Sequence, residues 1–112
     1  MKRDHDYLRD LLFEIENQED NLLIMDLSSE RKRWHHVELL CDCGYMTQIS
    51  DTGFRLTSQG HDFIDSIRDE GIWSNTKAMV AETGGNATLE IIKNLASGFL
   101  KKKISDHTGM EL

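Results

Sequence analysis

The sequence contains no proline, only two cysteines and no long run of apolar side chains. Its longest apolar run, Leu22–Met25, has the length of a strand, whereas a membrane-spanning helix needs roughly 18 such residues. No signal-peptide core follows the charged N-terminal residues. We therefore expect a cytoplasmic protein in which Cys41 and Cys43 are free thiols rather than a disulfide.

Positive charge is also scarce. Thirteen Lys and Arg stand against 20 Asp and Glu, which gives a formal net charge of −7 and a pI of about 5.1. Residues 1–56 carry −5 of this charge and residues 57–112 carry −2. The balance argues against a non-specific nucleic-acid coat protein, because the affinity of such a protein comes from Lys and Arg that neutralise phosphates.

The apolar content is sufficient for one small domain. Hydrophobic residues make up 38% of the 112 residues, and autonomous domains usually have about 100–200 residues. A TIM barrel, at about 250 residues, is excluded by length. Apolar periodicity and turn residues predict the following elements. They are a helix at 4–17, a strand at 22–27, a helix capped by Ser28 or Ser29 and ending near 42, strands at 45–50 and 54–56, helices at 58–70 and 73–82, and a last helix capped by Asn86 or Thr88 and ending near 103.

This order predicts an α+β fold with a winged-helix-like core. The core consists of helix, strand, helix, two-stranded wing and helix, and two additional C-terminal helices follow it. The turn Asp51–Gly53 between the two short strands is a hairpin signal. We expect the core at residues 1–70, a helical extension at 71–104 that packs on the core or forms a dimer interface, and a frayed tail at 105–112.

Three stretches of the chain resemble a known family. They are Met1–Asp4 opening directly into the first helix, Leu56–Asp69 followed by Ile72–Trp73, and Gly84–Gly85 before a helix that ends in Leu100–Lys103. Together they resemble small phage- and prophage-associated proteins that are grouped as a domain of unknown function with a winged-helix core. The resemblance implies the winged-helix fold and an origin in a phage or mobile element. It implies no particular activity.

The basic run at the start of the second helix predicts a nucleic-acid contact. In a winged-helix protein, the helix before the wing is the usual recognition helix, and its first residues meet base edges or phosphates. We expect Arg31, Lys32, Arg33 and His35 to contact DNA, together with Arg55 on the wing. The alternative is a solvated basic turn that pairs with nearby Asp or Glu. One helix of the usual helix-turn-helix is not found, and the wing carries one cation, which weakens the DNA interpretation.

Acidic side chains recur at helical spacing on two other predicted helices. We expect these stripes to be either solvated faces or a surface that binds a basic protein. The residues are Asp4, Asp6 and Asp10 on the first helix, and Asp62, Asp65 and Asp69 on the third.

The sequence offers little for catalysis or metal binding. Zinc sites usually space their first two cysteines as C-x₂₋₄-C, whereas Cys41 and Cys43 are separated by one residue, with His35 and His36 nearby. The dipeptide His61–Asp62 resembles one found in metal-dependent phosphohydrolases, but no P-loop or nucleophile motif accompanies it. We expect no metal, no cofactor and no enzymatic activity.

These observations predict a non-enzymatic winged-helix binding module of phage or mobile-element type that acts as a DNA-binding regulator. The alternative is an acidic protein-binding factor, either an anti-defence inhibitor or a nucleic-acid mimic, that occupies a basic surface of a host complex. The apolar face from Leu89 to Leu100 on the last helix closes the core or forms a homodimer.

Overall fold

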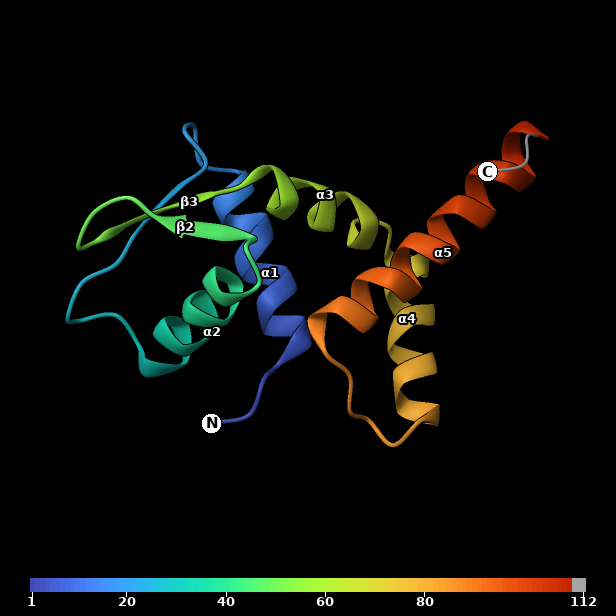
Figure 1. The fold of residues 1–112 in the computed structure, drawn as a ribbon, viewed down its shortest axis with the longest axis horizontal. Helices are drawn as coiled ribbons and strands as arrows, with labels where there is room; N and C mark the ends of the chain where they lie inside the picture. Colours follow the sequence, from blue (N-terminus) through green and yellow to red (C-terminus); the bar gives the residue numbers. More distant parts are fainter. Residues whose placement is uncertain (110–112) are drawn as a thin grey trace. The chain divides into compact units, whose positions relative to one another are not determined.

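The computed structural model describes residues 1–109 and confirms the predicted α+β fold. These residues form five helices and a small three-stranded antiparallel sheet (Figure 1). The elements are α1 (His5–Glu16), β1 (Leu22–Ile24), α2 (Arg31–Asp42), β2 (Met46–Gln48), β3 (Gly53–Leu56), α3 (Ser58–Ile67), α4 (Glu70–Glu82) and α5 (Leu89–Thr108).

The structure forms two compact units, and the boundary falls between Ile64 and Asp65, inside α3. The first unit contains α1, the three strands, α2 and most of α3. The second unit contains the end of α3 together with α4 and α5. The part of the chain that is consistent with a winged-helix-like arrangement therefore lies in the first unit.

Strand β3 is central in the sheet, with β1 on one side and β2 on the other. Leu23 lies opposite Phe54 in the β1–β3 pair, and Met46 lies opposite Leu56 in the β2–β3 pair. These four side chains are buried. Side chains alternate between the two faces of a strand. The neighbours of these four residues within each strand, such as Arg55 between Phe54 and Leu56, therefore lie on the opposite, open face of the sheet.

The core of the first unit lies between the sheet and its helices. Helix α1 packs against β1 and β3, and α2 packs against β2 (Figure 1). The rings of Tyr45 and Phe63 stack with their centroids 4.6 Å apart, which attaches α3 to the connection between α2 and β2. The predicted apolar stripe of α1 is confirmed, since its four aliphatic residues Leu8, Leu11, Leu12 and Ile15 are all buried.

The second unit is a helical hairpin in which α4 packs against α5. Their connection, residues 83–88, contains Gly84 and Gly85, which both have positive φ angles that favour glycine. Thr88 is the N-cap of α5 and accepts a hydrogen bond from the amide of Ile91 at 3.1 Å. Of the two N-caps predicted for the last helix, Asn86 and Thr88, the structure confirms Thr88.

Two predicted boundaries before the wing are wrong. The strand predicted at 22–27 ends at residue 24, and α2 begins later than a cap at Ser28 or Ser29 predicts. The reason is a turn at Asp26, whose Oδ1 accepts from the Ser28 amide at 2.8 Å and whose amide donates to the Ser29 hydroxyl at 3.2 Å. Both serines are used in this turn, so the N-cap of α2 is Glu30, which makes no side-chain capping bond.

The predicted helix at 58–70 is also too long. It ends at Ile67, and α4 begins at Glu70 rather than near residue 73. Asp69 accounts for this change, because its Oδ1 accepts from the Ile72 amide at 2.9 Å and thereby caps α4. A capping residue has non-helical backbone angles, so the chain cannot continue as one helix through this position.

The last helix is longer than predicted. It runs to Thr108, where Gly109 ends it with a left-handed φ of 72°. Residues 105–108 of the predicted frayed tail are therefore helical, and residues 110–112 lie outside the described part of the chain. Within residues 1–109, no helix is both long enough and apolar enough to cross a membrane.

A close backbone approach at Gly60 joins α3 to the start of β2. The amide of Thr57 donates to the Tyr45 carbonyl at 3.1 Å, and the Thr57 hydroxyl accepts from the Gly60 amide at 3.0 Å. A β-carbon at Gly60 would collide with the Tyr45 carbonyl oxygen and lie 3.2 Å from a methyl group of Leu56. The first turn of α3 therefore requires a residue without a side chain at this position.

We expect Gly60→Ala to lower the free energy of unfolding by about 1–3 kcal/mol, the usual effect of forcing atoms into a packed site. Urea denaturation followed by circular dichroism measures this change. The matched control is Gln59→Ala, an exposed neighbour in the same turn, for which we expect a change within about 0.5 kcal/mol. Equal effects of the two substitutions would contradict the assigned packing.

Candidate functional site

The basic residues at the start of α2 make ion pairs with α1. Lys32 Nζ lies 3.0 Å from Asp4 Oδ2, and Arg33 Nη1 lies 2.8 Å from Glu14 Oε2. Lys32 also lies over the ring of Tyr7, with its Nζ 4.6 Å from the ring centroid. Two of the cations that were predicted to contact DNA are thus held by α1 of the same molecule.

The outward face of α2 carries both signs of charge. Arg31, His35, Glu38 and Asp42 follow each other at intervals of four, three and four residues, so they lie on one side of the helix. Arg31, Glu38 and Asp42 are exposed, and His35 is partly exposed. The predicted recognition face is therefore positive at its beginning and negative along its second half.

His36 is the residue at this junction that the sequence analysis did not identify. It is fully buried; its Nε2 accepts from the Asp4 amide at 2.9 Å, and its Nδ1 lies 2.7 Å from the Lys32 carbonyl oxygen. Because Nε2 accepts, Nδ1 is the ring nitrogen that donates to the Lys32 carbonyl. Its ring also contacts Tyr7, with the centroids 4.8 Å apart. No spacing rule singles out this histidine, since its partner is a backbone amide 32 residues away.

Asp4 has three roles at the same junction. Its side chain caps α1 by accepting from the Tyr7 amide at 3.0 Å, it pairs with Lys32, and its own amide binds His36. The hydrogen bond from the Tyr7 amide and the one from Lys32 lower the pKa of the Asp4 carboxyl below its ordinary value. Asp4 is therefore part of the α1–α2 contact and does not belong to an unoccupied acidic stripe.

The other predicted acidic residues lie in different settings. Asp6 and Asp10 are exposed on α1, and Asp62 is exposed on α3. Asp65 pairs with Arg68 at 2.9 Å. The acidic stripe predicted on the third helix is not a single helix face, because Asp69 lies beyond the end of α3 and caps α4.

The wing carries aliphatic side chains on the open face of the sheet. Ile24 lies opposite Gly53, and the Ile49 amide donates to the Gly53 carbonyl at 2.9 Å. A β-carbon at Gly53 would lie 3.3 Å from Ile49 Cγ1 on this face. The Ile24 side chain is 66% exposed, that of Ile49 is 53% exposed and that of Leu27 is fully exposed. We call Ile24 and Ile49 the wing-tip patch.

Arg55, the predicted cation of the wing, also lies on the open face. It is opposite Leu22 and Thr47 in the sheet register. Its guanidinium donates to the Leu56 carbonyl at 3.0 Å. Arg55 is exposed but is directed in part to its own backbone, so the wing presents a weak positive charge.

The cysteines are free thiols, as predicted. Cys41 is partly buried and Cys43 is exposed at the end of α2. Burial raises the pKa of both thiols, and the nearby Asp42 raises them further. A raised pKa disfavours the thiolate that a nucleophile or a metal ligand requires. Among residues 1–109, no group of three or more His, Cys, Asp or Glu side chains is arranged to hold a metal ion.

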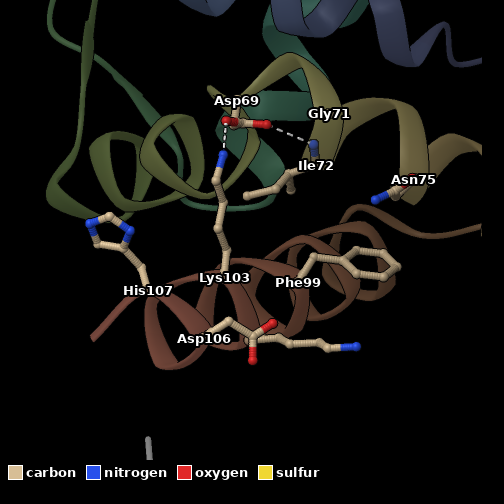
Figure 2. Close-up of a pocket in the computed structure, with 9 residues that line it drawn as sticks. Asp69, Gly71, Ile72, Asn75, Phe99, Lys103, Asp106 and His107 are labelled. Atoms are coloured by element: carbon tan, nitrogen blue, oxygen red, sulfur yellow. Dashed lines mark hydrogen bonds and ion pairs between the residues drawn. The ribbon is translucent and has the colours of Figure 1, made fainter. Parts of the chain in front are cut away.

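The second unit contains an open groove of about 620 Å³ between α4 and α5. Figure 2 shows Lys103 reaching from α5 to Asp69 at the start of α4, with Ile72 and Phe99 beside this ion pair. Lys102, Asp106 and His107 complete the charged part of the lining, and Asn75 also lines the groove.

The fold and these surfaces define a small, acidic α+β protein with a winged-helix-like arrangement in its first unit. A family model described as "Hypothetical protein (DUF2513)" matches residues 2–86. The chain therefore belongs to this family, whose function is unknown. An "Uncharacterized protein" of Haemophilus influenzae is 26% identical over 119 residues, which cover 94% of this chain and 100% of that protein. No solved structure matches the chain.

We expect Asp4→Ala to destabilise the protein by about 0.5–2 kcal/mol at neutral pH, the range for loss of an N-cap. Because the folded-state pKa of Asp4 is lowered, its contribution is fully present above the ordinary Asp pKa of about 3.9 and is lost as the pH falls through the folded-state value. Urea unfolding at several pH values between about 7 and 3 measures the difference from the wild type. A difference that does not shrink in acid would contradict the assigned ion pair.

We expect His36→Leu to lower the free energy of unfolding by about 1–3 kcal/mol, because the buried Asp4 amide loses its acceptor. His35→Leu is the matched control, since its ring lies partly exposed on the same helix. Urea unfolding at neutral pH compares the two variants. If the control is destabilised as strongly as His36→Leu, the hydrogen bond to Asp4 is not the cause.

Proposed function

We propose that this protein is a non-enzymatic binding module whose first unit binds a protein partner through the wing-tip patch and its acidic surroundings. The single observation that carries the proposal is the exposure of Ile24 and Ile49 on either side of Gly53, on the open face of the sheet. Exposed aliphatic side chains that are grouped and rimmed by polar residues are typical of protein interaction sites.

The charges around the patch support a basic partner. The amide of Met25 donates to the Thr52 carbonyl at 2.7 Å, so the end of β1 lies beside the wing turn. This contact brings the exposed Asp26 and Asp51 to the same end of the sheet as the patch. The hydrogen bonds from Ser28 lower the pKa of Asp26, which is therefore charged at neutral pH. An apolar centre with a negative rim fits a partner that has a positive rim.

The first unit as a whole also carries an excess of negative charge. Residues 1–64 contain 7 Lys and Arg and 13 Asp and Glu, a formal charge of −6. Two of the seven cations, Lys32 and Arg33, are paired with carboxylates of α1. Arg31 lies exposed before the acidic half of the outward face of α2. This distribution favours a protein partner over the phosphate backbone of DNA, whose binding depends on available cations.

The resemblance to phage and prophage proteins suggests a class of partner. A host complex that handles nucleic acid has a basic surface, and an acidic protein with an apolar contact point can occupy such a surface. In this proposal the protein acts by blocking or redirecting that complex, as an anti-defence inhibitor or a nucleic-acid mimic does.

Capture from a host lysate tests the proposal with four forms of the protein as bait. We expect the wild type to retain a specific protein, and Ile24→Ser and Ile49→Ser to weaken retention at least about tenfold, since burial of one aliphatic side chain contributes about 1.5–3 kcal/mol. Ile104→Ser is the matched control, because Ile104 is a similarly exposed isoleucine in the second unit. It should retain the same protein as the wild type.

The outcomes are distinct. Retention that is equal for all three isoleucine variants would overturn the wing-tip assignment, and failure to retain any specific protein would overturn the proposal. Titration of a labelled DNA duplex gives an independent answer at low and moderate salt. Binding that weakens steeply with salt and is lost in Arg31→Glu would establish the DNA-binding alternative in its place.

A further inference from the structure

Helix α5 has an exposed stripe beside the face that packs on α4. Ile91, Leu95, Gly98 and Lys102 follow each other at intervals of four, three and four residues, which places them on one side of the helix. We call these four residues the α5 stripe. Ile91 is 48% exposed, Leu95 is partly buried and Lys102 is exposed. A β-carbon at Gly98 would meet nothing within 4 Å, so the helix backbone is open to a close neighbour at this point.

We propose that the α5 stripe binds the same stripe of a second copy of this chain, with the two helices antiparallel about a two-fold axis. The axis passes between the levels of Leu95 and Gly98. In this arrangement each Leu95 packs onto Gly98 of the second copy, and each Ile91 lies opposite Lys102 of the second copy. A two-fold interface uses the same patch on both subunits, and the stripe has this self-complementarity of large against small residues.

The groove between α4 and α5 provides the space for Ile91 of the second copy. Lys102 belongs both to the α5 stripe and to the lining of the groove, whose apolar walls are Ile72 and Phe99 (Figure 2). An isoleucine that enters beside Lys102 can contact both walls and the aliphatic stem of the lysine. The dimer therefore buries the exposed Ile91 side chains and covers part of the groove in each copy.

Charge also selects the antiparallel arrangement. Glu90 and Lys101 are separated by 11 residues, about three helical turns, so they lie on the same flank of the α5 stripe. Antiparallel helices related by a two-fold axis face each other with the same flank, so Glu90 of each copy lies within reach of Lys101 of the other, whereas in parallel helices in register these two residues lie about 16 Å apart along the axis. Lys103 is already paired with Asp69 within one copy, which leaves Lys101 for this contact.

This surface lies in the second unit and does not depend on the partner proposed for the wing-tip patch. The whole of α5 also lies outside the family match, which ends at residue 86. The occupant is a second copy because both halves of the contact, the projecting side chain and its groove, are present on the same helix hairpin.

Sedimentation equilibrium of the full chain over a range of concentrations tests the proposal. We expect the wild type to form a dimer, and Ile91→Glu to raise the dimer dissociation constant at least about tenfold, because a charge would be buried at the interface. The matched control is Ile104→Glu, since Ile104 is 41% exposed on a different side of the same helix. We expect its dissociation constant to stay within about twofold of the wild type.

Charge reversal tests the antiparallel register. We expect Glu90→Lys and Lys101→Glu each to weaken the dimer about three- to tenfold, and the double variant to restore it to within about twofold of the wild type. Glu90→Lys opposes the helix dipole in the first turn of α5, so an effect on helix stability alone would leave the double variant at least as weak as Glu90→Lys. Circular dichroism of each variant checks that the helices are retained.

Three results would overturn the proposal. The first is a wild type that stays monomeric up to about 100 μM, a concentration at which even a weak specific dimer is populated. The second is equal dissociation by Ile91→Glu and Ile104→Glu. The third is a double charge variant that stays as weak as the single ones, which would exclude the antiparallel register.

Discussion

The buried imidazole of His36 is the contact on which the arrangement of the first unit depends. It accepts from the Asp4 amide at the start of α1 and binds the Lys32 carbonyl in α2. A buried polar group is tolerated only when its hydrogen bonds are made, so this geometry fixes the two helix ends relative to each other. Lys32 then reaches the carboxylate of Asp4. One junction therefore holds α2 in place and pairs one of its cations with a carboxylate of the same chain.

This junction determines what the first unit presents to a partner. With Lys32 and Arg33 bound to α1, a unit of formal charge −6 retains little positive surface at the helix before the wing. Its other distinct feature is the group of exposed aliphatic side chains at the end of the sheet. Negative charge around an apolar contact point is suited to a protein that has a basic rim, and poorly suited to phosphate.

Local patterns in the sequence predicted much of the fold. The apolar spacing of α1 identified its buried face, the turn at Asp51–Gly53 identified the hairpin, and Thr88 identified the start of α5. These signals depend on neighbouring residues alone. The errors arose where a side chain bound the backbone in a way that spacing does not reveal. Asp26 binds the two serines that were expected to cap α2, and Asp69, which was expected to lie within the third helix, caps α4.

The candidate site shows the same division between local and long-range information. The excess of acid, the free thiols and the order of helices and strands follow from residues that are adjacent or a few positions apart, so the chain alone is enough to predict them. Whether a cation is available to a ligand is different, because it depends on groups far away in sequence. Lys32 and Arg33 lie 28 and 19 residues from their partners, and His36 lies 32 residues from the amide it binds. Only the packing of α2 against α1 brings these groups within hydrogen-bond distance and thereby turns a predicted basic site into an internal contact.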